Sequence, residues 1–236
     1  MERFSYWTNL NSRKPEIWIR YHALRSILLE IESLDFDNLP DFDTTKEFIL
    51  LAIATSQSLF TRDIKSNEAI EALTEERGIV ASLIEEWNSN EKVEPLFYRH
   101  SLSQQEISIY WARLVERFDI SKGFCWSPID GIVRPTALIF TVEAFEKAIP
   151  PQKLRDILAS HGINRVLELR ENSEDCWLDL SEFEAYYNMA EGFWSSQSLD
   201  WIIYASHESS ISIGGWLSTE IKQAWPDWET GVWTTP

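Results

Sequence analysis

The chain has 236 residues, of which 44% are hydrophobic, and no stretch approaches the roughly 20 apolar residues that a transmembrane helix requires. Its 38 acidic and 21 basic residues give a net charge of −17, which disfavours nucleic acid as a direct ligand. We therefore expect a folded, soluble protein that resides in the cytoplasm without membrane contact, as a monomer or as a homo-oligomer.

The first half of the chain has the apolar spacing of helices. Apolar side chains recur every three or four residues between residues 15 and 34, which predicts an amphipathic helix. Thr44 and Glu47 predict a capping box at the start of a second helix. Residues 48–54 are apolar on nearly all sides, so we expect this second helix at the centre of a helical group rather than at the surface.

Two further helices complete this helical half. Residues 67–87 carry an apolar stripe beside many glutamates. Gly78 interrupts them and costs about 1 kcal/mol relative to alanine, unless close packing requires it. Ser103 and Glu106 form a second predicted capping box, and the helix that follows them should end near Gly123.

Short β-prone runs replace helices in the second half. Residues 137–142, 166–169 and 177–180 are predicted as strands, and residues 151–162 as a helix that ends at a glycine. Residues 186–197 mix Tyr, Phe and Trp with Asn, Gly and Ser, which indicates an aromatic loop lying over the sheet edge.

Residues 199–228 are the best-defined part of the predicted fold. The run 201–205 is apolar on both faces of a strand, which predicts a central position in the sheet. A serine-containing turn then leads into a returning strand. Gly214-Gly215 ends that strand before a helix that stops at Pro226.

Together these elements predict an α+β fold, in which an N-terminal helical region precedes a mostly antiparallel sheet with a C-terminal helix. We place the helical region at residues 1–122 and the α+β region at residues 123–236, built on the hairpin and helix of residues 199–228. The two regions form either separate domains or one continuous domain.

The tripeptide Ser206-His207-Glu208 contains the residue types of a hydrolase triad. Neighbours on a strand point to opposite faces, so these three side chains do not converge on one another. We expect His207 at the end of its strand, on the face of Trp201, where it would act with a distant carboxylate. The alternative is a hydrogen-bonded structural histidine.

No cofactor or metal site is predicted. Cys125 and Cys176 lack the paired spacing of a zinc site, and we expect two buried free thiols. The other three histidines show no metal-ligand spacing, and the glycines show no phosphate-binding pattern.

The acidic excess is patterned along the chain. No Lys or Arg occurs between Arg170 and Lys222, and six carboxylates fall within residues 171–184. They are Glu171, Glu174, Asp175, Asp179, Glu182 and Glu184. We predict that this acidic stretch binds a cationic protein partner, with Trp177, Tyr187 and Trp194 as aromatic anchors. The alternative is a solvated surface that keeps the protein soluble.

Three functions remain after these exclusions. Strong acidity, many aromatic residues and missing catalytic motifs are typical of a non-catalytic protein-binding module, such as a bacterial-type inhibitor or immunity protein that caps a basic toxin or enzyme. A hydrolase that uses His207 with a carboxylate is the alternative, and a structural role is the third. We prefer the binding module.

Overall fold

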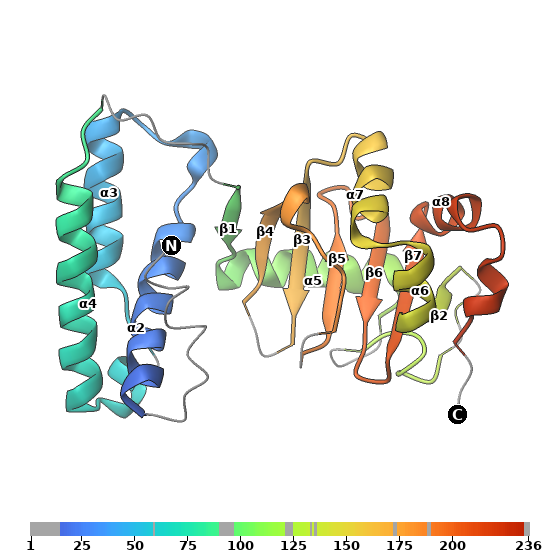
Figure 1. The fold of residues 1–236 in the computed structure, drawn as a ribbon, viewed down its shortest axis with the longest axis horizontal. Helices are drawn as coiled ribbons and strands as arrows, with labels where there is room; N and C mark the ends of the chain where they lie inside the picture. The colour runs from blue at the N-terminus through green and yellow to red at the C-terminus, as the bar shows by residue number, and fades with distance from the viewer. Residues whose placement is uncertain are drawn as a thin grey trace. The chain divides into compact units, whose positions relative to one another are not determined.

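The structure, a computed structural model, describes residues 15–58, 60–89, 97–120, 125–132, 134, 136–171, 174–187 and 190–233 (Figure 1). The chain divides into two units, Met1–Pro95 and Leu96–Pro236. The described part of the first unit is helical and the second unit contains the sheet, which confirms the predicted α+β class. Gly123, near which we expected a helix to end, lies outside the described residues.

The described residues of the first unit contain three α-helices, which are α2 (Pro15–Glu32), α3 (Phe42–Thr55) and α4 (Asn67–Glu85). Side chains from all three meet in one apolar cluster, which comprises Ala23, Ile27, Ile49, Ile53, Leu73 and Ile84. The 3.6-residue period places these positions on the inner side of each helix. The prediction of amphipathic helices is confirmed for α2 and α4, although Ile70 and Trp87 of the predicted stripe at residues 67–87 are 44% and 41% exposed.

One of the two predicted capping boxes is wrong. Helix α3 begins at Phe42, and its N-cap is Asp41, whose carboxylate accepts a hydrogen bond from the amide of Thr44 at 3.1 Å. Asp41 provides an acceptor one turn earlier than the sequence pattern indicated, because aspartate is as good an N-cap as threonine. The second box is confirmed at the start of α5 (Gln104–Phe118), where Ser103 and Glu106 cap each other reciprocally.

Helix α3 is also less buried than we expected. Phe48 is 42% exposed and Leu51 is 61% exposed, although both belong to the apolar run. Each helix of a three-helix unit has an inner and an outer side, and these two side chains lie on the outer side of α3. The prediction of a central helix is therefore wrong.

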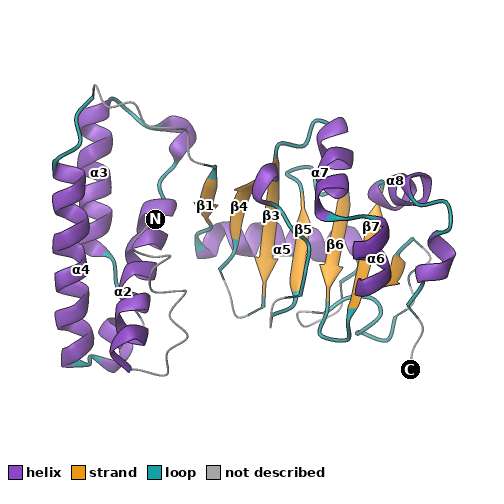
Figure 2. Ribbon diagram, viewed as in Figure 1, coloured by secondary structure: helices purple, strands orange, loops and turns teal. Residues whose placement is uncertain are grey.

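The second unit contains a seven-stranded sheet in which all neighbouring strands are antiparallel, with the order β1-β4-β3-β5-β6-β7-β2 (Figure 2). The strands are β1 (Arg99–Ser101), β2 (Leu138–Thr141), β3 (Arg165–Arg170), β4 (Cys176–Asp179), β5 (Gly192–Ser195), β6 (Trp201–Ala205) and β7 (Ser210–Gly215).

Strand β5 replaces the aromatic loop that we predicted for residues 186–197. It pairs with β3 on one side and β6 on the other. Gly192 gives this strand a weak local signal, and the strand forms because both of its edges are hydrogen-bonded. Strand β1 and helix α6 (Val142–Ala148) were also missed by the sequence pattern.

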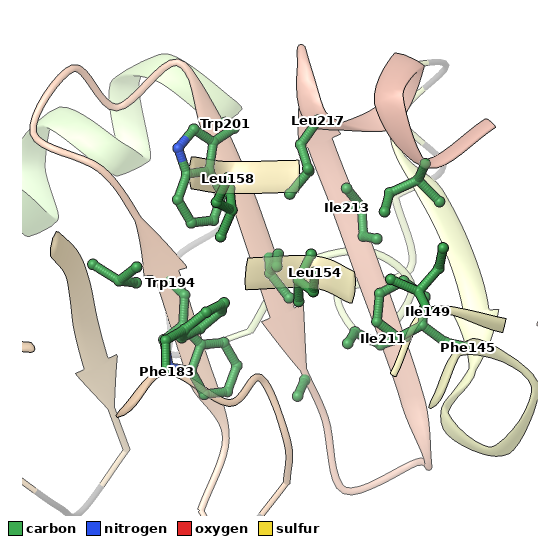
Figure 3. Packing of buried hydrophobic residues seen from close by; sticks show 14 of the residues in the cluster. Phe145, Ile149, Leu154, Leu158, Phe183, Trp194, Trp201, Ile211, Ile213 and Leu217 are labelled. Atoms are coloured by element: carbon green, nitrogen blue, oxygen red, sulfur yellow. The ribbon is translucent and has the colours of Figure 1, made fainter. Parts of the chain in front are cut away.

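Helices cover both faces of the sheet. Figure 1 shows α6, α7 (Pro151–Ser160) and α8 (Leu217–Ala224) on one face and α5 on the other. Trp201 contributes to the first layer, together with Leu154 and Leu158 of α7 (Figure 3). Ile203 belongs to the same cluster. The alternate residues of β6 pack with Leu114 of α5 in the second layer. All five residues of β6 are buried, as its apolar pattern predicted.

Helix α5 therefore belongs to the sheet unit, which begins at Leu96. From the sequence we placed the end of the helical region at residue 122, because α5 has the same amphipathic pattern as the helices before it. Among the described residues, no helix is both long enough and apolar enough to cross a membrane.

Candidate functional site

The predicted acidic stretch is divided between two ends of the sheet. The register of β3 and β4 pairs Arg165 with Asp179 and Glu168 with Cys176. Asp175 therefore precedes β4 at one end of the sheet and Asp179 closes it at the other, about 13 Å away at the rise of a strand. The stretch forms two acidic groups and not the single face that we expected.

The first group lies at what we call the hairpin end of the sheet, comprising residues 171, 174–175, 191 and 206–209. Its members come from three segments because Arg170 pairs with Gly192, and Gly192 pairs with Ala205. The amide of Glu171 donates to the carbonyl oxygen of Glu191 at 2.9 Å. The register thus brings five carboxylates to this end: Glu171, Glu174, Asp175, Glu191 and Glu208.

The second group lies at the opposite end of the sheet, where Asp179, Glu182 and Glu184 follow one another. Asp179 caps the turn Leu180–Glu182, since its carboxylate accepts from the amide of Ser181 at 3.0 Å. Arg155 of α7 lies 3.9 Å from Glu184. A basic residue distant in sequence therefore accompanies these carboxylates, which the local charge count did not reveal.

His207 meets a buried carboxylate at the hairpin end. Its Nδ1 lies 2.5 Å from Oε1 of Glu191, and its Nε2 lies 3.4 Å from Oε1 of Glu208. The hydroxyl of Tyr204 donates to Oε2 of Glu191. The side chain of Glu191 is 7% exposed and that of His207 is 53% exposed, so a partly exposed imidazole contacts a buried carboxylate.

The position of His207 corrects our expectation for its face. We placed it with Trp201 by continuing the alternation of β6, but β6 ends at Ala205 and His207 lies in the following turn. Its ring reaches Glu191, whose other oxygen binds Tyr204 in the layer shared with α5. The period of a strand does not extend into a turn, because the backbone no longer alternates there.

Two protonated groups lie close to Glu191. Burial and the hydrogen bond to Glu191 raise the pKa of Tyr204 well above its ordinary value. Burial raises the pKa of the Cys125 thiol, and the charges of Asp130 and Glu191 raise it further. Both groups keep their protons at neutral pH, so Cys125 lacks the thiolate character of a nucleophilic cysteine.

The carboxylate of Asp175 is hydrogen-bonded to the backbone at the hairpin end. Its Oδ1 accepts a hydrogen bond from the amide of Arg170 at 2.7 Å. Burial raises the pKa of Asp175, and the charge of Glu168 raises it further, against the effect of this hydrogen bond. No group of three or more His, Cys, Asp or Glu side chains within the described residues is arranged to hold a metal ion.

The three predicted aromatic anchors are exposed to different extents. Trp194 is fully buried in β5, and its Nε1 donates to Oε2 of Glu168 at 2.7 Å, so it is no surface anchor. Trp177 is half-buried with its ring 5.5 Å from that of Tyr110. Tyr187 is 39% exposed, as a surface anchor requires.

Tyr186, which the sequence did not single out, is 40% exposed beside Tyr187. The guanidinium of Arg170 lies 5.3 Å from the Tyr186 ring, and one of its nitrogens donates to the Tyr186 carbonyl at 3.4 Å. These contacts hold Tyr186 next to the hairpin end, since Arg170 is the last residue of β3, and Tyr187 follows Tyr186 in the sequence.

Sequence reasoning did not group Glu191, Glu208 and Tyr186 with the acidic stretch, although it considered Glu208 beside His207. The three residues belong to three separate segments, and the strand register brings these segments to the same end of the sheet, so no local pattern indicates the group. Comparisons of the chain with protein-family models, with curated proteins and with solved structures found no significant match.

Proposed function

We propose that this protein is a non-catalytic binding module of the inhibitor or immunity type, whose hairpin end binds a cationic protein partner. The observation that supports it most is the convergence of five carboxylates from three segments beside two exposed tyrosines. Carboxylates and aromatic rings together are the composition of an interface for a basic protein.

The two residue types have different roles in this proposal. The carboxylates produce a negative potential that accelerates encounter with a basic protein above the neutral range of about 10⁵ to 10⁶ M⁻¹s⁻¹. The rings of Tyr186 and Tyr187 provide apolar area that a partner desolvates, which is where interfaces usually concentrate their binding energy.

The opposite end of the sheet provides an internal comparison. There, Arg155 lies near Glu184, and His161 lies 3.5 Å from Glu220 with its ring stacked on Trp216 at 4.2 Å. Each end thus has a histidine beside its carboxylates, and the two ends differ in their arginine. Arg155 lies near Glu184 and weakens the attraction of that end for a basic protein, whereas Arg170 at the hairpin end is 9% exposed and lies 3.3 Å from Glu168.

Two matched double variants test this proposal. Glu171→Gln with Glu208→Gln removes two charges from the hairpin end, and Glu182→Gln with Glu184→Gln removes two from the opposite end. Each tagged protein is incubated with a lysate of its own cells at about 50 mM and about 500 mM salt, between which screening increases strongly. Mass spectrometry then identifies the captured proteins.

We expect the wild-type protein to capture a basic protein that is released at high salt, the hairpin-end variant to lose it, and the opposite-end variant to retain it. Equal capture by both variants, or capture that does not respond to salt, would contradict the proposal. Far-UV circular dichroism of both variants controls for folding.

A hydrolase is the second candidate, and the contact between Glu191 and His207 favours it, since a carboxylate that orients an imidazole is part of many general-base sites. Hydrolysis of a generic activated ester by the wild type and by His207→Asn separates the two functions. The binding module predicts equal rates, whereas a large loss of rate in the variant would favour the hydrolase.

A further inference from the structure

We propose that the contact between Glu191 and His207 makes the hairpin end a pH-dependent binding surface, which binds a cationic partner more weakly as the pH falls from about 8 to about 6. This inference rests on the proposed function, because it assigns a regulation to the same surface. Its basis is the position of one imidazole between two carboxylates.

The geometry couples His207 to both carboxylates. Nδ1 is 2.5 Å from Glu191 and Nε2 is 3.4 Å from Glu208, so a proton taken up by the imidazole lies between two negative charges. Imidazole is the side chain whose charge ordinarily changes between pH 5 and 8. A proton taken up at this contact makes the pair of Glu191 and His207 more positive by one unit, whichever of the two side chains holds it.

The other groups around the pair do not offset this change. From β6, Tyr204 donates to Glu191 and remains protonated because its pKa is raised by burial and by that hydrogen bond. From residues 125–132, Cys125 carries a thiol whose pKa is also raised by burial. Both groups thus keep the same charge between about pH 6 and about pH 8.

Two charged side chains that act on Cys125, those of Asp130 and Arg134, form an ion pair with each other. Asp130 and Arg134 lie 2.7 Å apart, and Arg134 is 7% exposed. On the solvent side, the indole of Trp233 donates to the carbonyl oxygen of Glu208 at 3.3 Å and adds no charge. Glu171, whose amide binds the carbonyl of Glu191, contributes a further carboxylate at this end.

A proton on the pair of Glu191 and His207 changes the net charge of the hairpin end, which has five carboxylates, by one unit. A unit charge about 7 Å from a cationic group in water alters an association constant about threefold at low ionic strength. We therefore expect the dissociation constant for a cationic ligand to be about three times higher at pH 6 than at pH 8, with a smaller ratio at high salt.

The probe for this test is a nona-lysine peptide with a rhodamine label, because neither lysine nor this dye titrates in the range used. Fluorescence anisotropy gives its dissociation constant at about pH 6, 7 and 8 in dilute buffer. His207→Asn keeps an amide near the position of Nδ1 and stays neutral, and His207→Lys stays positive.

We expect His207→Asn to bind the peptide with the same strength at all three pH values, close to wild type at pH 8. His207→Lys should bind weakly at all three, close to wild type at pH 6. The matched control is His161→Gln, which changes the histidine that contacts Glu220 at the opposite end of the sheet. It should retain the full pH dependence of the wild type.

Three results would overturn the inference, and they differ from failure of the proposed function. A pH-independent wild type, a His207→Asn variant with unchanged pH dependence, or a His161→Gln variant without it would each contradict the assignment to His207. If the peptide binds the Glu171→Gln/Glu208→Gln variant as tightly as the wild type, the hairpin end is not its binding surface and both proposals fail.

Discussion

Helix α3 and strand β6 hold two strongly apolar runs of the chain, and the structure buries them to very different extents. Phe48 and Leu51 in α3 are 42% and 61% exposed, whereas Trp201, Ile203 and the other residues of β6 are 0% exposed. The same kind of sequence thus forms a core strand in one unit and a partly exposed helix in the other.

The difference arises from the number of layers around each element. Strand β6 has a strand on each edge and helices on each face, so every side chain points into protein. Helix α3 packs on α2 and α4 with its inner side, and its outer side has no covering layer among the described residues. Apolar content therefore predicts burial only where the topology supplies two layers.

The largest effect in this comparison is expected from a pair of alanine substitutions. Trp201→Ala removes a fully buried indole and should lower the free energy of unfolding by about 3 to 5 kcal/mol. Leu51→Ala should change it by at most about 0.5 kcal/mol, because the side chain is largely exposed. Denaturant titration followed by circular dichroism measures both. Similar losses in the two variants would show that α3 is buried in solution.

A second test uses two glycines, one from each unit. Gly215 has φ +71°, and a Cβ there would lie 2.0 Å from the carbonyl oxygen of Asp200, so Gly215→Ala should destabilise by about 2 kcal/mol or more. Gly78 in α4 has no heavy atom within 4 Å of an added Cβ, so Gly78→Ala should stabilise by about 1 kcal/mol. Thermal unfolding of both proteins checks the opposite signs.

The smallest test concerns the pH dependence of stability. Because burial raises the pKa of Asp175, the folded state binds its proton more strongly than the unfolded state does. This group therefore lowers stability as the pH rises from the ordinary aspartate value through the folded pKa. Asp175→Asn removes that loss of stability at the higher pH. The melting temperature at about pH 7 minus that at about pH 3.5 should therefore be larger for the variant than for the wild type.

Asp200 provides a control of opposite sign at the other end of the sheet. Burial raises its pKa, but hydrogen bonds from Ser198 and Trp216 hold the pKa below its ordinary value overall. Its stabilising effect is present above the ordinary aspartate pKa and is lost as the pH falls through the folded pKa. Asp200→Asn should reduce the same temperature difference, and a change of equal sign in both variants would contradict these assignments.

The sequence by itself determined the local elements that have strong periodic patterns. Helix α2, helix α4 and the succession of β6, β7 and α8 follow from apolar spacing, turn residues and the helix stop at Pro226. The capping box of Ser103 and Glu106 was equally readable, because its hydrogen bonds join residues three positions apart. These features depend on neighbours in sequence, and a neighbour pattern is sufficient to specify them.

Only the tertiary structure decided which strands pair, which apolar side chains are covered and which charges gather. Strand β5 has a weak local signal and exists because β3 and β6 hydrogen-bond to both of its edges. The same pairings bring Glu191 to His207 and separate Asp175 from Asp179, although the last two are four residues apart in sequence. Strand register joins residues that are distant along the chain, so no local pattern contains it.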